Sequence, residues 1–184
     1  MAHTFLPGYG DYKQLRVYQV TEAIYDLTYH FAHRYLSSSD RTMDQMIQAA
    51  RSGKQNIVEG NLASSTSSET EIKLTNVARA SLGELLLDYQ DYIRVRALPL
   101  WDDAHPRYEG VRRYARSNAF ITEHNELFAK MNDEELCNLA ITLIHQADCM
   151  LARLMLHQQE RFAKEGGIRE RMSNVRRAAR RENS

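Results

Sequence analysis

The apolar residues of this chain recur at alternating spacings of three and four positions along four long segments. This spacing is typical of helices that bury one face, because a helix brings residues three and four positions apart onto the same side. The first segment runs from Tyr12 to Leu36. Its apolar stripe is formed by Val17, Val20, Ile24, Leu27 and Phe31. We therefore expect a long amphipathic helix over residues 12–36.

A second helix is expected after Asp40, because aspartate is a residue type that caps helix N-termini. The apolar rhythm of this segment continues to Gly60. Its stripe includes Ala50 and Gly53, and such small residues let a neighbouring helix approach closely. We therefore expect this helix to pack tightly against a neighbour.

Two further long helices are expected, each with a recognisable start. The third begins at a predicted capping box, Ser68 to Glu71, and reaches about Ala97. The fourth opens at the cap formed by residues 132–135 and ends near Gly166, because a glycine permits the left-handed backbone that closes many helices. These two helices carry long runs of leucine, isoleucine and methionine.

The connection between the third and fourth helices is long, and a basic suffix follows the fourth. Pro99 and Pro106 disfavour helix over residues 98–106, whereas a short basic helix is expected from about Tyr108 to Ser117. Beyond Gly166 the apolar residues keep helical spacing among arginines. This suffix is either a basic amphipathic helix or a disordered tail that becomes one on a partner.

These patterns predict an all-α fold, because no segment shows the period-two alternation of a half-buried strand. Four long helices joined mostly by short connections indicate an antiparallel up-down-up-down four-helix bundle. We expect the bundle to occupy residues 1–165, with an insertion at about 98–131, and the suffix to occupy residues 166–184.

The helices carry more apolar and aromatic residues than one bundle core can bury. The excess suggests a surface through which copies of the chain associate, since tyrosine is enriched at protein interfaces. The candidate interface residues are Tyr18, Tyr25, Tyr29, Leu86 and Leu87. The alternative is that the long insertion folds back and covers these faces.

The formal net charge of zero hides two basic segments. Residues 107–116 hold four arginines and one glutamate, and residues 166–184 hold six arginines and two glutamates, so together they carry +7 against −7 elsewhere. Guanidinium groups pair well with phosphate oxygens, so these segments are candidates for binding nucleic acid. The candidate residues are Arg107, Arg112, Arg113, Arg116, Arg169, Arg171, Arg176, Arg177, Arg180 and Arg181. The alternative is that these segments are solvated helix ends, or that their arginines pair with acidic groups of a neighbouring subunit.

The sequence offers little support for catalysis or metal binding. The Glu-x-x-His motif of di-iron bundles does not occur, and His145 with Cys149 is only half of a zinc site. The two cysteines, Cys137 and Cys149, are expected to be free, buried thiols, because twelve residues of helix separate them by about 18 Å. We expect no enzymatic activity and no cofactor.

A stripe of polar residues marks the second and third predicted helices. Ser52 has no histidine or lysine beside it to act as a base, so we expect a hydrogen-bond network that fixes the register of the two helices and not a nucleophilic site. The members of this polar motif are Gln45, Ser52, Asn56, Glu59, Ser81 and Glu84.

The same two helices resemble a known family. Two sets of residues look like the signature helices of the four-helix-bundle proteins of ribosomal-RNA intervening sequences, and the resemblance covers about residues 13–160. The residues that carry it are Gln45, Ala49-Ala50, Ser52, Asn56-Ile57, Glu59-Gly60, Ala78, Ser81-Leu82 and Glu84-Leu85. The chain would be a longer member with a C-terminal suffix.

The resemblance implies an up-down bundle, commonly a homopentamer, without known catalytic activity. One branch comprises the accessory variability proteins of diversity-generating retroelements, which bind a reverse transcriptase and its RNA through a basic surface. Our first hypothesis is therefore a non-enzymatic, homo-oligomeric accessory protein that binds RNA or another nucleic acid, alongside a reverse transcriptase or other polymerase. The alternative is a protein-interaction scaffold without nucleic-acid binding. We expect a cytoplasmic location and no membrane partner, because no apolar run approaches the ~18 residues of a membrane-spanning helix.

Overall fold

The computed structural model describes residues 11–182, and every regular element in this range is helical. This confirms the all-α fold class. The elements, in chain order, are a 3₁₀ helix η1 (Tyr12–Gln14) and the α-helices α1 (Arg16–Tyr35), α2 (Arg41–Ala63), α3 (Ser68–Val95), α4 (Tyr108–Arg116), α5 (Ala119–Phe128), α6 (Asp133–Glu165) and α7 (Ile168–Glu182).

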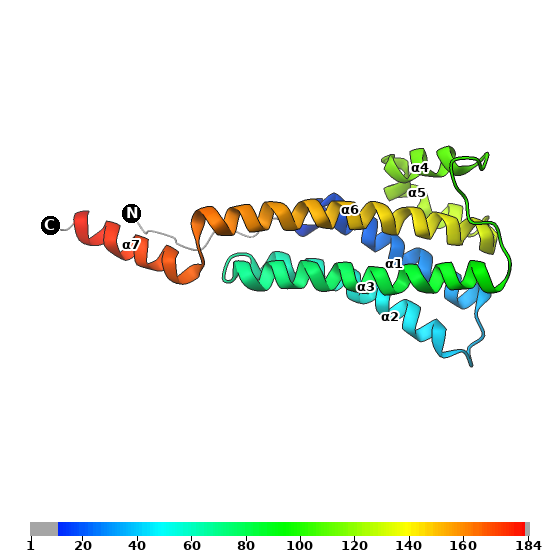
Figure 1. The fold of residues 1–184 in the computed structure, drawn as a ribbon, viewed down its shortest axis with the longest axis horizontal. Coiled ribbons are helices and arrows are strands. Elements are labelled where there is room, and N and C mark those ends of the chain that lie inside the picture. The colour runs from blue at the N-terminus through cyan, green and yellow to red at the C-terminus, as the bar shows by residue number, and fades with distance from the viewer. Residues whose placement is uncertain (1–10, 183–184) are drawn as a thin grey trace.

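Four long helices make up the body of the molecule. Helix α1 packs against α2 and α6, and α3 packs against the same two helices. The colours of Figure 1 show that α1 and α3 run in one direction and that α2 and α6 run in the other. Helices α4 and α5 lie at one end of this body, and α7 projects from the opposite end (Figure 1).

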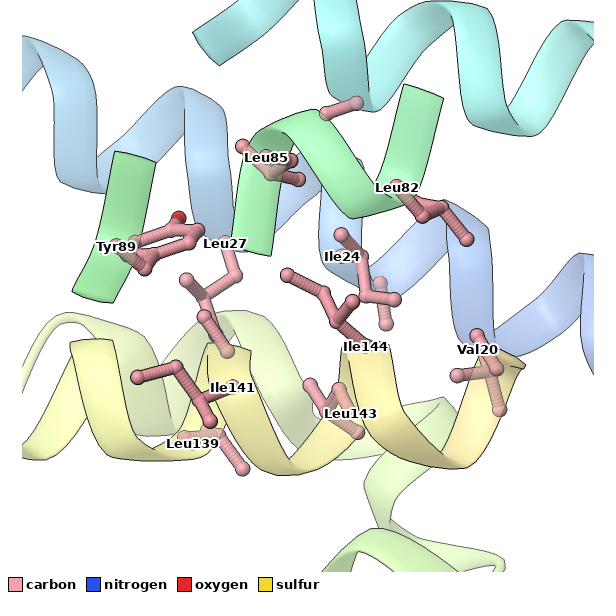
Figure 2. Close-up of a cluster of buried hydrophobic side chains, with 14 of the residues drawn as sticks. Val20, Ile24, Leu27, Leu82, Leu85, Tyr89, Leu139, Ile141, Leu143 and Ile144 are labelled. Atoms are coloured by element: carbon pink, nitrogen blue, oxygen red, sulfur yellow. The ribbon is translucent and has the colours of Figure 1, made fainter. Parts of the chain in front are cut away.

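Buried residues of all four long helices form the core, and Figure 2 labels members from three of them, α1, α3 and α6. Figure 2 shows side chains of all three helices converging, and each labelled residue is buried. The labelled residues are Val20, Ile24, Leu27, Leu82, Leu85, Tyr89, Leu139, Ile141, Leu143 and Ile144. Tyr89 is completely buried, and its hydroxyl donates to Thr28 Oγ1 at 3.0 Å, so the polar atom of this ring is satisfied inside the core.

Helices α2 and α3 approach each other closely at Gly53, as the small residues in the stripe of α2 predict. A β-carbon at this glycine would lie 2.8 Å from Leu82 Cδ2 and 3.0 Å from its Cγ. Leu82 is only 1% exposed, so it has little space into which to move. An alanine here would force Leu82 to shift, so the packing of α3 favours glycine at this position.

Two expected helix starts have different outcomes. The capping box at the start of α6 is confirmed, with Asn132 Oδ1 accepting from Glu135 N at 2.9 Å and Asn132 N donating to Glu135 Oε2 at 3.0 Å. The capping box predicted at Ser68 is wrong, because Ser67 caps α3 and accepts from Thr70 N at 3.1 Å. Glu71 cannot serve the cap, since its carboxylate is buried against Arg161 of α6.

The segment between α3 and α6, which the sequence analysis expects as an insertion, contains a helix that was not anticipated. The basic helix expected near Tyr108 is present as α4, but a second helix, α5, follows it and packs on α1. Phe120 and Phe128 of α5 are fully buried in the same core. The insertion therefore folds back over part of the apolar surface that the long helices leave uncovered.

Two further expectations need correction. Cys137 is buried as expected, but Cys149 is exposed. Judged by length and composition alone, the helical stretch Asp133–Ala178 is long and apolar enough to cross a membrane, which the sequence analysis did not foresee. In the structure, the α6 part of this stretch packs against α1 and α3.

Candidate nucleic-acid interface

The basic helix α4 is held against α6 by its apolar face. Ala115 is buried, and Val111 and Tyr114 pack against the core. The ring of Tyr114 meets Phe120 of α5 edge-on, with 5.6 Å between the ring centroids. Since one face of α4 is anchored in this way, its remaining positions carry arginines along the surface of the protein.

The loop before α4 is fixed to α6 by hydrogen bonds to Trp101. Its backbone N donates to Asn138 Oδ1 at 2.8 Å, and its indole Nε1 donates to Glu134 Oε1 at 2.7 Å. Asn138 Nδ2 also donates to Pro99 O at 3.0 Å. His105 stacks on the indole with 4.4 Å between the centroids and 10° between the planes. These contacts place the loop at the edge of a groove.

The groove lies between α4, α6 and this loop and has a volume of about 680 Å³. Arg112 and Arg116 enter it from α4, and His145 and Arg153 enter it from α6. The rings of Trp101 and Tyr108 also line it, as does Cys149. None of the described residues that line the groove is acidic. The groove is therefore an electropositive site with aromatic surface, of a size typical of ligand sites.

Two of the four arginines predicted here engage carboxylates of the same chain. Arg107 forms an ion pair with Glu135, and Arg112 Nη1 lies 3.0 Å from Glu109 Oε1. Glu109 is largely exposed, and exposed ion pairs of this kind contribute only about 0–1 kcal/mol, so a phosphate can replace the carboxylate at little cost. Arg112 also lies over the Tyr108 ring, with 5.3 Å from its Cζ to the centroid.

The other two arginines of this segment differ in where they point. Arg116 lines the groove, whereas Arg113 is exposed and is not among the groove-lining residues. Helical spacing explains the difference, because positions 108, 112 and 116 fall close to one face of α4 while position 113 is turned away from it. The structure therefore brings Arg112 and Arg116 together and leaves Arg113 apart.

The arginines of α7 form a second basic surface at the other end of the molecule. Five of them are exposed: Arg169, Arg176, Arg177, Arg180 and Arg181. Arg171 is different, since it is half-buried and its Nε and Nη2 atoms are shielded from solvent. It lines a separate pocket together with Glu71 and Arg161. The predicted arginines therefore divide into four groups: Arg112 and Arg116 in the groove, Arg107 and Arg113 outside it, the five exposed arginines of α7, and the half-buried Arg171.

No protein-family model, curated protein or solved structure matches the chain. Within residues 11–182, no group of three or more histidine, cysteine, aspartate or glutamate side chains is arranged to hold a metal ion.

The polar motif of α2 and α3 is brought together in part. Ser52 Oγ and Ser81 Oγ share a hydrogen bond of 2.9 Å across the two helices, and Asn56 Nδ2 donates to Ser52 O at 2.8 Å. Gln45 and Glu84, by contrast, are exposed and line a shallow groove beside this network. Glu59 is also exposed. The serine pair links α2 to α3 near the close approach at Gly53.

The residues predicted for association between copies differ in exposure. Tyr29 and Leu87 are 49% and 62% exposed, whereas Leu86 is half-buried. Tyr25 lies beneath Lys54, with 4.3 Å from Nζ to the ring centroid. Tyr18 donates to Glu22 Oε1 at 2.8 Å. Burial of its hydroxyl, and to a smaller extent this hydrogen bond, raises the pKa of Tyr18 to about 12. Tyr29 and Leu87 are thus the members of the set with the most apolar surface available.

The sequence analysis missed part of the groove. Arg153 was not a predicted site residue, and His145 was considered only as half of a metal site. A signal was present, because His145, Cys149 and Arg153 follow one another at spacings of four and therefore share one face of α6. The sequence does not show that this face lines a groove, because the groove forms only where α4 packs opposite it.

Proposed function

We propose that the protein is a non-enzymatic helical accessory protein that binds RNA or another nucleic acid through the groove between α4 and α6 and through the exposed arginines of α7. The observation that carries the proposal is the groove itself, in which Arg112, Arg116, Arg153 and His145 meet without an acidic lining residue. Such a site suits a phosphate backbone, because guanidinium groups bind phosphate oxygens in a bidentate manner.

The rings in the groove favour a single-stranded nucleic acid over a free anion. Proteins that bind single strands combine a positively charged channel with aromatic side chains on which bases stack. Tyr108 and Trp101 supply such rings beside the arginines, although Trp101 is only 6% exposed and Tyr108 is therefore the more accessible. The arginines of α7 would add attraction that does not depend on sequence and weakens with salt.

We also propose the architecture and setting that accompany this function. The antiparallel packing of α1, α2, α3 and α6 (Figure 1) supports an up-down-up-down four-helix bundle in residues 1–165, followed by the basic suffix 166–184 that contains α7. Residues 1–10 and 183–184 of these ranges lie outside the described residues. Exposed Tyr29 and Leu87 support homo-oligomerisation, with a homopentamer as the expected state. Such an assembly would present several copies of α7 to one nucleic acid in the cytoplasm, alongside a reverse transcriptase or other polymerase.

Fluorescence anisotropy with a labelled single-stranded RNA tests the groove. In the test variant Arg112, Arg116 and Arg153 are all replaced by glutamine, which removes three positive charges while keeping side-chain length. We expect the affinity to fall by about tenfold or more, and the slope of log K against log salt to become shallower by about 2, since each phosphate contact on a single strand contributes about 0.7.

A matched control removes the same charge elsewhere. Arg41, Arg51 and Lys73 are exposed and lie on α2 and α3, away from the groove, so their replacement by glutamine lowers the net charge equally. We expect this control to bind RNA nearly as well as the unmodified chain. Equal losses in the two variants would mean that only net charge matters and that the groove is not the binding site.

An interaction scaffold is the competing function, and exposed apolar residues favour it. Leu87, Val95 and Leu100 are each more than half exposed. A scaffold would capture its partners through such residues, so recovery of those partners would survive nuclease treatment and high salt. A protein that retains partners under both conditions and binds no RNA would support the scaffold and contradict nucleic-acid binding.

A further inference from the structure

Helix α7 is a basic amphipathic helix that extends away from the body of the protein. It is 15 residues long, and no other helix of residues 11–182 packs along it (Figure 1). Its apolar stripe is formed by Ile168, Met172 and Val175, at spacings of four and three. Isolated helices of this length are marginal in water, so a surface that covers the stripe would stabilise α7.

Helical spacing divides exposed arginines of α7 between two sides. Arg169 and Arg176 are seven residues apart and flank the apolar stripe, whereas Arg177 and Arg181 lie on the opposite face. A surface that covers the stripe would therefore meet Arg169 and Arg176 and leave the other two exposed. Such a surface should combine apolar side chains with two carboxylates about 10 Å apart along a helix.

The outward face of α3 has this pattern. Val77, Leu87 and Val95 are 37%, 62% and 69% exposed, and the exposed carboxylates of Glu84 and Asp91 are seven residues apart. Spacings of seven, seven and four place Val77, Glu84, Asp91 and Val95 on one side of the helix. This α3 face is about 27 Å long and α7 is about 22 Å long, so α7 can lie along it.

The α3 face is also rich in negative charge. Glu84 and Asp88 line the groove between α2 and α3 together with Asp44, and none of the described residues that line this groove is basic. Burial, followed by the carboxylates of Asp91 and Glu84, raises the pKa of Asp88. Arg94 pairs with Asp91 at 2.7 Å, but an exposed pair of this kind contributes only about 0–1 kcal/mol. Arginines from a partner would therefore offset the repulsion between these carboxylates.

Helix α7 is not placed to use the α3 face of its own chain. It leaves the body at the end where α3 begins, and it points away from α3 (Figure 1). We therefore infer that the apolar stripe of α7 docks on the α3 face of a second copy of this chain. In this contact Arg169 and Arg176 would face the two exposed carboxylates.

The contact joins two different surfaces, so successive copies would close into a ring or extend into a filament. The inference rests on the proposed association between copies, for which it names the surfaces. It does not rest on nucleic-acid binding, because Arg177 and Arg181 would stay on the outer side of the docked helix.

Sedimentation velocity of the nuclease-treated full chain tests this inference over concentrations of about 1–100 µM. Two variants reverse the charges of the two surfaces: Arg169→Glu with Arg176→Glu on α7, and Glu84→Lys with Asp91→Lys on α3. Each variant should weaken self-association about tenfold or more, because like charges would then meet. All four substitutions in one chain should restore self-association. These positions are exposed, so circular dichroism should show an unchanged helix content.

A matched control reverses the same charge on the opposite face of α7. Arg177→Glu with Arg181→Glu should self-associate like the unmodified chain. If the control is weakened as much as the α7 variant, if either charge reversal has no effect, or if the combined variant does not recover, the inference is overturned and the proposed homo-oligomerisation still stands. An unmodified chain that stays monomeric at about 100 µM would contradict both.

Discussion

Replacing Gly53 with alanine would test the close approach of α2 and α3. The added β-carbon would lie 2.8 Å from Leu82 Cδ2 and 3.0 Å from its Cγ, which is too close for either atom to remain in place. Leu82 is 1% exposed and packed among the core residues of Figure 2, so it can move only by displacing its neighbours. Forcing an extra methyl group into a packed core costs about 1–3 kcal/mol.

A second glycine in the adjacent helix gives the matched control. A β-carbon at Gly83 of α3 would meet nothing within 4 Å. Alanine is favoured over glycine inside a helix by about 1 kcal/mol, so Gly83→Ala should stabilise the protein by about that amount. Gly53→Ala gains the same helix propensity but also incurs the cost of the close contact with Leu82. The free energies of unfolding of the two variants should therefore differ by about 1–3 kcal/mol.

Urea denaturation measures this difference. Helix content can be followed by circular dichroism, and Trp101 provides a fluorescence signal because it is the single tryptophan and is 6% exposed. The two signals together check that unfolding is two-state. If Gly53→Ala proved as stable as Gly83→Ala, the helices would be further apart than the structure shows, and the reasoning would be refuted.

Three further predictions concern other parts of the molecule. Hydrogen bonding to Asp26 raises the pKa of His124, so this contact adds stability that is full below pH ~6.5 and is lost as the pH rises through the raised pKa. The melting temperature of His124→Gln should therefore not show this fall in stability across the same pH range, and a variant with the same pH profile as the unmodified chain would contradict the prediction. Asn138→Ala should cost about 1–3 kcal/mol in urea, because it leaves the buried N–H of Trp101 unpaired, whereas unaltered stability and tryptophan emission would show that the loop is not anchored there. Ellman's reagent should modify the exposed Cys149 in the native protein and should reach Cys137 only after unfolding. Reaction of both thiols in the native protein would contradict the burial of Cys137.

The long helices could be predicted from the sequence because their boundaries depend on local features. The spacing of apolar residues indicated α1, α2, α3 and α6, and the Asn132 cap marked the start of α6. The error at the start of α3 arose from a distant residue. Glu71 has the right spacing for a capping box with Ser68, but Arg161, ninety positions later, draws its carboxylate into the interior.

Helix α5 was missed because tertiary contacts stabilise it. Asn118 forms no side-chain capping bond, and Ser117 Oγ accepts from Phe120 N at 3.3 Å, a local contact that does not place the helix on the body of the protein. Instead, Phe120 and Phe128 enter the core, and His124 Nε2 meets Asp26 Oδ2 of α1 at 3.0 Å. A helix held in this way becomes predictable only after α1 is placed beside it.

The candidate site was predictable only in part for the same reason. A run of arginines in the sequence identified Arg112 and Arg116, but nothing in the sequence showed that α4 folds back over α6 and faces Arg153. The charge pattern also grouped Arg171 with the exposed arginines of α7, whereas the structure places it in an inner pocket. Local charge shows which residues are basic, while the fold decides what each of them faces.

The salt dependence of RNA binding tests the central claim most directly. The full chain is compared with a variant in which the exposed arginines of α7 become glutamine and Arg171 is kept: Arg169→Gln, Arg176→Gln, Arg177→Gln, Arg180→Gln and Arg181→Gln. Glutamine and arginine have similar helix propensities, so α7 should persist, and circular dichroism can verify it.

If these arginines contact phosphates, the plot of log K against log salt should be steep for the full chain and shallower by up to about 3.5 for the variant, because five contacts on a single strand each contribute about 0.7. Equal slopes for the two proteins would contradict the role of α7, and no binding of RNA by the full chain at low salt would contradict the proposed function as a whole.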